Sequence, residues 1–225
     1  MIQPASILVI YTGGTIGMVK DYTTGSLIPL KFEEFYTHVP ELNRIDAKLD
    51  YHSFEKAIDS SDMNPEHWAE IATVIYENYH SYDGFVVLHG SDTMAYTASA
   101  LSFMLQGLQK PVILTGSQLP IGVIRTDGKE NLITAIEIAS SKSSDDKALI
   151  QEVAIYFEYS LYRGNRASKV SADNFEAFDS PNFPQLGQIG EHIKVNRDLL
   201  RPIPNPTASF NVNQDLNTNV MDVAL

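Results

Sequence analysis

The chain has 225 residues, of which 44% are hydrophobic, so it can bury the core of a large domain and does not have the composition of a disordered chain. Its 16 basic and 28 acidic side chains give a formal net charge of −12, which argues against a protein that binds nucleic-acid phosphates through a basic face. The absence of cysteine excludes disulfides, a thiolate nucleophile and metal sites built on thiolates.

The sequence indicates neither membrane insertion nor metal binding. No stretch approaches the roughly 20 apolar residues of a membrane-spanning helix, and no export signal is evident, so we expect a cytoplasmic protein without a membrane partner. Two histidines that bind one metal ion from a helix are commonly four residues apart. No such pair occurs among the six histidines, which are His38, His52, His67, His80, His89 and His192.

Short apolar runs alternate with helical patterns from the N-terminus onward. Residues 7–11 (ILVIY) predict the first strand, and residues 47–54, which alternate weakly, predict the second. Asn64 is a suitable N-cap for a helix that begins at Pro65, because proline is favoured in the first helical turn. Apolar residues then recur at helical spacing as far as Tyr79.

The next strands are continuous apolar runs at residues 84–89, 111–115 and 153–157. Between them, apolar spacing predicts one helix from Met94 to Leu108, with Gly107 near its C-cap, and another from Leu132 to Ala139. This alternation is typical of parallel sheets covered on both faces. The sequence therefore predicts an α/β fold with a Rossmann-like, open, mostly parallel sheet flanked by helices.

The composition changes toward the C-terminus, where Pro202, Pro204 and Pro206 favour an extended connection. We expect residues 1–200 to form the first domain and residues 201–219 to form an inter-domain linker. The apolar run at residues 220–225 (VMDVAL) then has the pattern of a buried strand that is beginning.

Three predicted strand ends combine glycine with hydroxyl side chains: TGGTIG at 12–17, HGSDT at 89–93 and TGSQLP at 115–120. Ligands of open parallel sheets bind at such carboxyl ends. The first segment nearly matches the dinucleotide fingerprint, with Thr12 at the first glycine position, but a tight turn would also explain it. Helix capping would explain the second segment. The concentration of hydroxyl groups at three ends exceeds what capping requires and indicates a ligand site.

A nucleophile in this site would have to be an activated hydroxyl, because cysteine and the Gly-x-Ser-x-Gly motif are both absent. A tyrosine or a neutral lysine is suited to activating it. Tyr22 lies in a glycine-containing segment soon after Thr15, and Lys169 follows the basic run RGNRAS at 163–168. A solvated loop or an anion site is the alternative explanation for that run.

The motifs TGGTIG (12–17), DSSDM (59–63), HGSDTM (89–94) and LYRGNR (161–166) resemble those of bacterial L-asparaginases, in particular the cytoplasmic type I branch. The resemblance extends over essentially the whole chain. It implies hydrolysis of L-asparagine to L-aspartate and ammonia through a threonine ester, without a metal or organic cofactor. It also implies a homodimer or homotetramer and a second, smaller α/β domain whose first strand starts at 220–225.

The resemblance also implies roles for individual residues. Thr15 matches the nucleophile, and Tyr22 matches the lid-loop tyrosine that polarises it. Ser91, Asp92 and Lys169 match a second cluster of hydroxyl, acid and lysine, with serine in place of the usual threonine. Serine lacks the methyl group that restricts χ1, so we expect retained chemistry with slightly poorer preorganisation.

Substrate binding is implied for a further set of positions. Asp92 would face the substrate ammonium, and the backbone carbonyl of Ser117 would accept from the substrate amide. The α-carboxylate and amino groups would be held by Asp59, Ser60 and Ser61. Two alternatives stay open: a glutaminase or tRNA-dependent amidotransferase subunit of the same superfamily, and a non-catalytic amino-acid binding module.

Overall fold

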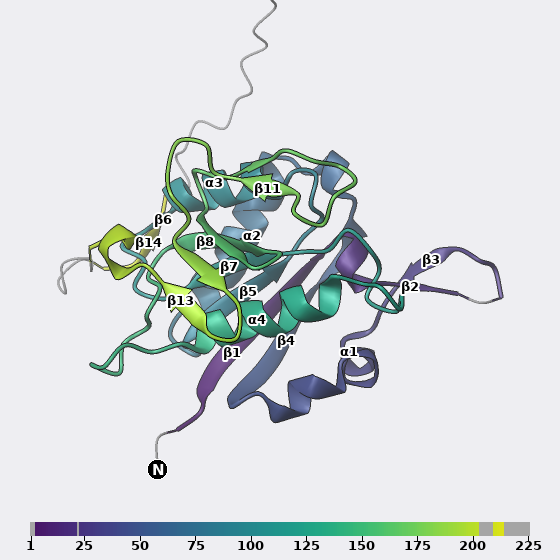
Figure 1. The fold of residues 1–225 in the computed structure, drawn as a ribbon, viewed down its shortest axis with the longest axis horizontal. Coiled ribbons are helices and arrows are strands. Elements are labelled where there is room, and N and C mark those ends of the chain that lie inside the picture. Colours follow the sequence, from purple (N-terminus) through teal and green to yellow (C-terminus); the bar gives the residue numbers. More distant parts are fainter. Residues whose placement is uncertain (1–2, 22, 203–208, 214–225) are drawn as a thin grey trace, which may run out of the picture.

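The computed structural model describes residues 3–21, 23–202 and 209–213. Its centre is an eight-stranded sheet in the order β13-β12-β9-β8-β7-β5-β1-β4 (Figure 1). Five strands are parallel, namely β4 (Ala47–Ile58), β1 (Ala5–Gly13), β5 (Gly84–Leu88), β7 (Val112–Thr115) and β8 (Val153–Phe157). The prediction of an open, mostly parallel sheet is thereby confirmed, as are all five predicted strands.

Three strands beyond the predicted five extend the sheet in the antiparallel sense. They are β9 (Ser160–Arg163), β12 (Gly187–Ile189) and β13 (Ile193–Val195). Strand β8 turns into β9 through Glu158 and Tyr159, both of which have positive φ. The sheet is therefore mixed, with its parallel part at one side and an antiparallel edge at the other.

Helices cover both faces of the sheet, and side chains of each strand alternate between the two cores. In β1, Ile7 and Val9 pack in one core, whereas Leu8 and Ile10 pack in the other. The first core is closed by α1 (Phe32–His38) and α4 (Gly128–Ser140), and the second by α2 (Pro65–Asn78) and α3 (Met94–Met104). Burial on both sides explains why the central strands are continuously apolar.

The helix boundaries agree with the sequence prediction in one case and differ in another. Asn64 caps α2, since its Oδ1 accepts from the His67 N–H at 3.1 Å. Helix α3 ends at Met104, before the predicted end at Leu108, because Leu105–Gln106 leave it to form strand β6. Gly107 then adopts a φ of 69° in the turn that follows.

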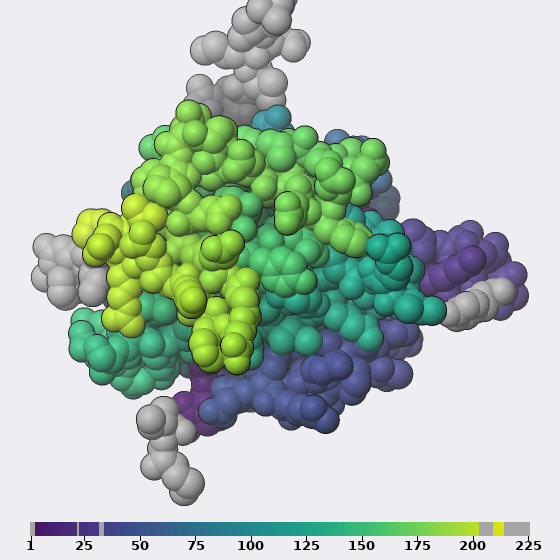
Figure 2. Space-filling model, in the orientation of Figure 1, coloured from purple at the N-terminus to yellow at the C-terminus, as the bar shows by residue number. Residues whose placement is uncertain are grey.

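Short elements complete the described structure. The hairpin β2 (Met18–Lys20) and β3 (Leu27–Pro29) follows the first strand end and projects from the body, as Figure 2 shows. Strand β10 (Ser168–Lys169) pairs with β11 (Phe178–Asp179). The described residues also form four 3-10 helices: Thr15–Gly17, Pro40–Arg44, Ser60–Asp62 and Arg197–Leu199.

The proposed linker at 201–219 lies partly outside the described residues, and the proposed strand start at 220–225 lies wholly outside them. Within the linker, β14 (Asn211–Val212) pairs with β6, and Phe210 stacks on Tyr79 with ring centroids 3.7 Å apart. Among the helices that the structure describes, none has the length and apolar character needed to cross a membrane.

Candidate active site

The segments that follow β1, β4 and β5 meet at one end of the sheet, and glycines make this contact possible. A Cβ atom on Gly14 would lie 2.4 Å from the backbone nitrogen of Gly90. A Cβ atom on Gly90 would lie 2.5 Å from Ser60 Oγ. Gly14 also has a φ of 84°, a conformation in which other residues are strained. Glycine is therefore required where these three backbone segments touch.

Thr15 follows this contact directly and begins the 3-10 helix Thr15–Gly17. Its side chain is half-buried, while the next residue, Ile16, is fully buried and anchors the turn in the core. The Thr15 hydroxyl forms no hydrogen bond with another residue that the structure describes. Tyr22, the predicted partner of this hydroxyl, lies outside the described residues.

Asp59, Ser60 and Ser61 form the segment that leaves β4. Asp59 Oδ1 accepts from the N–H and the hydroxyl of Ser61, each at 2.9 Å. These bonds hold the pKa of the Asp59 carboxyl below its ordinary value, so it stays ionised. Ser60 is buried, and its carbonyl oxygen accepts from Thr93 Oγ1 at 2.7 Å, which joins this segment to the one after β5.

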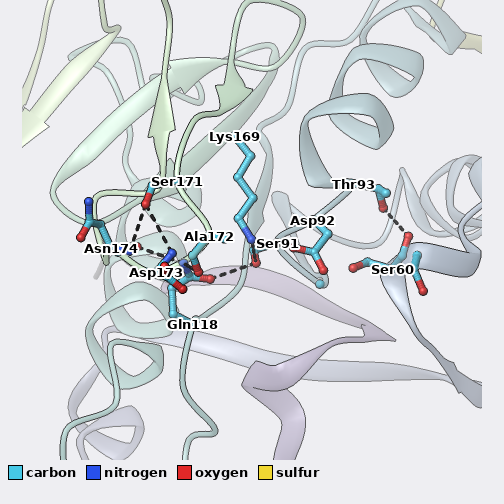
Figure 3. Close-up of polar contacts among 12 residues, drawn as sticks. Ser60, Ser91, Asp92, Thr93, Gln118, Lys169, Ser171, Ala172, Asp173 and Asn174 are labelled. Atoms are coloured by element: carbon cyan, nitrogen blue, oxygen red, sulfur yellow. Dashed lines mark hydrogen bonds and ion pairs between the residues drawn. The ribbon is translucent and has the colours of Figure 1, made fainter.

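Ser91, Asp92 and Lys169 lie together although Lys169 is distant in sequence (Figure 3). Lys169 Nζ donates to Ser91 Oγ at 2.9 Å and to Asp92 Oδ1 at 2.6 Å. The Lys169 side chain is only 14% exposed and the Asp92 side chain is 68% exposed. The ammonium is therefore held inside the site, while the carboxylate faces outward.

This arrangement bears on two alternative explanations from the sequence and overturns the first of them, helix capping. No side chain caps the start of α3, because Thr93 donates to Ser60 and Ser91 Oγ donates to Gln118 Oε1 at 3.1 Å. Lys169 itself is mostly buried and paired, whereas residues 164–166 of the basic run before it form a turn in which Arg166 is exposed.

The segment after β7 carries Ser117, which is buried and donates from Oγ to the carbonyl of Leu119 at 2.6 Å. The Asp127 carboxylate holds this loop by accepting from the N–H of Gln118 at 2.7 Å and of Leu119 at 3.0 Å. Ser117 also lies close to the first strand end, because a Cβ on Gly128 would contact both Ser117 Cβ, at 3.2 Å, and Ile16 Cγ1, at 3.4 Å.

Gln118 is a site residue that sequence reasoning missed. Its Oε1 accepts from Ser91, while its Nε2 donates to the carbonyls of Ala172 at 2.9 Å and Asn174 at 3.0 Å. It therefore ties the segment after β7 to the Ser91 loop and to the chain that follows Lys169 (Figure 3). Its place in the segment TGSQLP was the only indication in the sequence. An amide side chain at that position does not by itself predict hydrogen bonds to three residues distant in sequence.

His89 was also missed as a site residue. It is completely buried, and burial lowers its pKa to about 4, so the ring is neutral at physiological pH. Its Nδ1 lies 2.7 Å from the carbonyl oxygen of Gly90, and its Nε2 lies 2.9 Å from Thr97 Oγ1. Thr97 Oγ1 in turn accepts from Trp68 Nε1 at 3.0 Å.

Taken as chemistry, the site offers a hydroxyl without a hydrogen-bond partner among the described residues, a second hydroxyl beside an ammonium, and two carboxylates. Direct hydrogen bonds connect Ser91 and Asp92 to Lys169 and connect Asp59 to Ser61. Thr15 lies near Ser91 because the preceding residues, Gly14 and Gly90, are in contact; no hydrogen bond joins the two side chains among the described residues. The described residues contain no group of three or more histidine, aspartate or glutamate side chains placed to hold a metal ion.

Comparison with known proteins gives a consistent result. Residues 6–201 match the family described as Asparaginase, N-terminal. The chain is 47% identical to L-asparaginase 1 of Escherichia coli (strain K12) over 193 residues, which cover 85% of this chain and 55% of that protein. It thus spans about half the length of this curated relative.

Two solved structures are similar as well. L-asparaginase I from Vibrio cholerae superposes with a TM-score of 0.81 at 43% identity, covering 93% of this chain and 61% of the other. The probable cytoplasmic L-asparaginase from Campylobacter jejuni gives a TM-score of 0.72 at 27% identity, covering 85% and 57% respectively.

Proposed function

This chain belongs to the asparaginase family, and on that premise we propose that it carries the nucleophile and the substrate-binding groups of an amidohydrolase that converts L-asparagine to L-aspartate and ammonia. The observation that carries the proposal is the cluster in which Lys169 bonds both Ser91 and Asp92, next to the glycine contact that precedes Thr15. Such a cluster suits acyl transfer, because it combines hydroxyl groups with a cation that lowers the cost of removing their protons.

The proposed reaction has two steps. Thr15 Oγ attacks the carbonyl carbon of the side-chain amide, the C–N bond breaks, and the nitrogen leaves as ammonia after it has taken up a proton. Water then attacks the resulting ester, which releases L-aspartate and restores the hydroxyl. We assign to Tyr22 the polarisation of Thr15, and to Ser91, Asp92 and Lys169 the proton handling of the second hydroxyl cluster.

Recognition of the zwitterionic substrate follows from the charges of the site. The exposed Asp92 carboxylate has one oxygen bonded to Lys169, and its other oxygen suits the substrate ammonium. We assign the α-carboxylate and amino groups to Asp59, Ser60 and Ser61, and the amide nitrogen to the backbone carbonyl of Ser117. This assignment is supported by the hydrogen bonds that already order these segments.

Further parts of the proposal concern the setting of the site. The chain resembles a protein whose name describes it as a probable cytoplasmic L-asparaginase, and we propose the same compartment here. We propose that residues 1–200 form the catalytic domain, that residues 201–219 connect it to a second domain beginning at 220–225, and that the enzyme works as a homodimer or homotetramer.

Ammonia release from L-asparagine and L-glutamine tests the proposal. Because the E. coli relative is longer, the assay uses both this chain and its fusion to the C-terminal part of E. coli L-asparaginase 1. We expect turnover that Thr15→Ala reduces by about 1000-fold or more, as loss of a nucleophile does. The matched variant Thr73→Ala removes a hydroxyl that bonds only within α2 and leaves turnover unchanged.

Other outcomes would replace the proposal. Appreciable turnover by folded Thr15→Ala refutes the nucleophile assignment. Ammonia release that requires aminoacyl-tRNA indicates an amidotransferase subunit. Thermal stabilisation by asparagine without any ammonia from either protein indicates a binding module.

A further inference from the structure

His89 lies directly beneath the Ser91 loop, at the end of β5, and none of its surface is exposed. It therefore cannot touch a substrate. Its ring nitrogens contact only the Gly90 carbonyl and the Thr97 hydroxyl among the described residues. The geometry of these two contacts determines which nitrogen carries the proton.

A carbonyl oxygen can only accept a hydrogen bond, so the nitrogen 2.7 Å from Gly90 O must be protonated. In the neutral ring, Nε2 is then an acceptor, and it receives the Thr97 hydroxyl hydrogen over 2.9 Å. The Thr97 oxygen is free to accept from Trp68 Nε1 at 3.0 Å. Each member of the chain Trp68–Thr97–His89–Gly90 thus donates to the next, which fixes the ring in one tautomer.

The last acceptor in this series of hydrogen bonds is the Gly90 carbonyl, which belongs to the peptide bond between Gly90 and Ser91. The Gly90 carbonyl and the Ser91 N–H are the two ends of one planar peptide unit and point in opposite directions. A bond from His89 to the carbonyl therefore directs the Ser91 N–H away from the buried ring. That N–H donates to no acceptor among the residues that the structure describes.

Gly90 has no side chain with which to hold this peptide in place. It is packed between Gly14 and Ser60, and any Cβ there would collide with Ser60. Among the described residues, the bond from His89 therefore restrains the direction of the Gly90 carbonyl, while the Ser91 side chain is held separately by Lys169 and Gln118. A hydrogen bond to a carbonyl also polarises the peptide and makes its N–H a stronger donor.

We propose that His89 is a positioning residue for the amidohydrolase reaction. Through Nδ1–H it fixes and polarises the Gly90–Ser91 peptide, so that the Ser91 N–H is presented to the amide oxygen that becomes negatively charged when Thr15 attacks. The inference rests on the proposed function. Removal of one donor to a developing oxyanion typically lowers turnover by about 100- to 1000-fold. A misdirected Ser91 N–H would therefore reduce the rate of the reaction.

Two substitutions of His89 distinguish the contact made by Nδ1 from the contact made by Nε2. Asparagine places an amide N–H near the position of Nδ1, and glutamine places a polar atom near the position of Nε2. His89→Asn therefore keeps a donor for Gly90 O, whereas His89→Gln keeps only the contact with Thr97. A purely structural role predicts that activity falls in both variants in proportion to their loss of thermal stability.

We expect His89→Asn to keep kcat for asparagine within about 3-fold, and His89→Gln to lose about 10- to 100-fold in kcat with KM nearly unchanged. A KM-neutral loss points to transition-state stabilisation and not to substrate binding. Equal losses in the two variants, or losses that follow their melting temperatures, would overturn the proposal.

A second measurement does not depend on activity. In protein labelled with 15N-histidine, NMR reports which ring nitrogen is protonated, and we expect protonated Nδ1 for His89. We also expect the Ser91 amide resonance to shift on addition of L-aspartate in the native protein and in His89→Asn, but not in His89→Gln. If neither the native chain nor its fusion to the C-terminal part of the E. coli relative releases ammonia, the proposed function fails. Protonation on Nε2, or equal shifts in all three proteins, refutes the role of His89.

Discussion

Lys169 Nζ lies 2.9 Å from Ser91 Oγ, and the same hydroxyl donates to Gln118 Oε1 at 3.1 Å. The ammonium and the hydroxyl come from β10 and from the loop after β5, so the contact exists only in the folded chain. An ammonium that donates to a hydroxyl oxygen stabilises the alkoxide character that develops when this hydroxyl passes its proton onward. This geometry, with a Lys169 side chain that is only 14% exposed, supports the proposed role of the pair in proton transfer.

Lys169→Met tests this pair, because methionine keeps the unbranched side chain up to the ε position and removes the charged nitrogen. We expect kcat for ammonia release to fall by about 100-fold or more. Stability should change little, since the Asp92 carboxylate that loses its partner is 68% exposed and stays hydrated. The matched control Lys48→Met removes an exposed ion pair with Asp50 and leaves kcat unchanged. Full activity in folded Lys169→Met would contradict the assignment.

Gly14→Ala tests the contact that joins the first and third strand ends. The new methyl group would lie 2.4 Å from Gly90 N, at a residue whose φ is 84°. We expect loss of both activity and stability, with a destabilisation of about 2 to 4 kcal/mol from strain and overlap combined. Gly25→Ala is the control: Gly25 also has a positive φ, 75°, but open space around it. Urea unfolding and ammonia release of the two variants should differ strongly, and equal behaviour would show that steric contact is unimportant.

Most of the parallel part of the sheet could be predicted because four of its strands are buried on both faces, whereas the edge strand β4 is mostly half-buried or exposed. Burial produces continuous apolar runs such as GFVVL in β5 and VAIYF in β8. The antiparallel edge could not be predicted in this way. Strand β9 (SLYR) is short and polar at both ends, and β12 and β13 have three residues each. Such strands form because a neighbouring edge is available, which is a property of the folded chain.

The same distinction applies to the site. Thr15, Ser91 and Ser117 follow strand ends, so their meeting could be predicted from the parallel sheet alone. Gln118 and His89 could not be identified, because their roles depend on Ala172 in one case and on Thr97 and Trp68 in the other. Serine in place of threonine at position 91 leaves the hydroxyl bonded to Lys169, so that departure from the family pattern keeps the contact.

Asp127→Asn tests how firmly the Ser117 loop must be held. The buried carboxylate accepts two backbone N–H groups, at 2.7 and 3.0 Å, whereas an amide turns one donor toward another donor. We expect a loss of about 2 kcal/mol in the free energy of unfolding and a higher KM for asparagine, because the Ser117 carbonyl shifts. Asp145→Asn, in an exposed loop, is the control. A variant with native KM and native urea midpoint would contradict this role.

Glu158 provides a pH-dependent prediction, because its folded state favours the protonated carboxyl. Burial, followed by the charges of Asp127, Glu130 and Glu176, raises its pKa from an ordinary value of 4.5 to about 7. Between these two pH values the folded chain binds a proton that the unfolded chain has released. The stabilising contribution of Glu158 is therefore complete below pH 4.5 and is lost as the pH rises through 7.

Glu158→Gln keeps the shape of the side chain and remains neutral at every pH, so it removes this dependence. We expect the variant to gain on the order of 1 kcal/mol relative to the native protein between pH 5 and pH 8, a value reduced because water screens the half-buried carboxyl. Urea unfolding of both proteins at the two pH values measures the gain, and Glu137→Gln, on the exposed face of α4, serves as the control. If the difference between Glu158→Gln and the native protein is the same at both pH values, the raised pKa is wrong. If the difference instead shrinks toward pH 8, an unrecognised cation must face Glu158 in the folded chain.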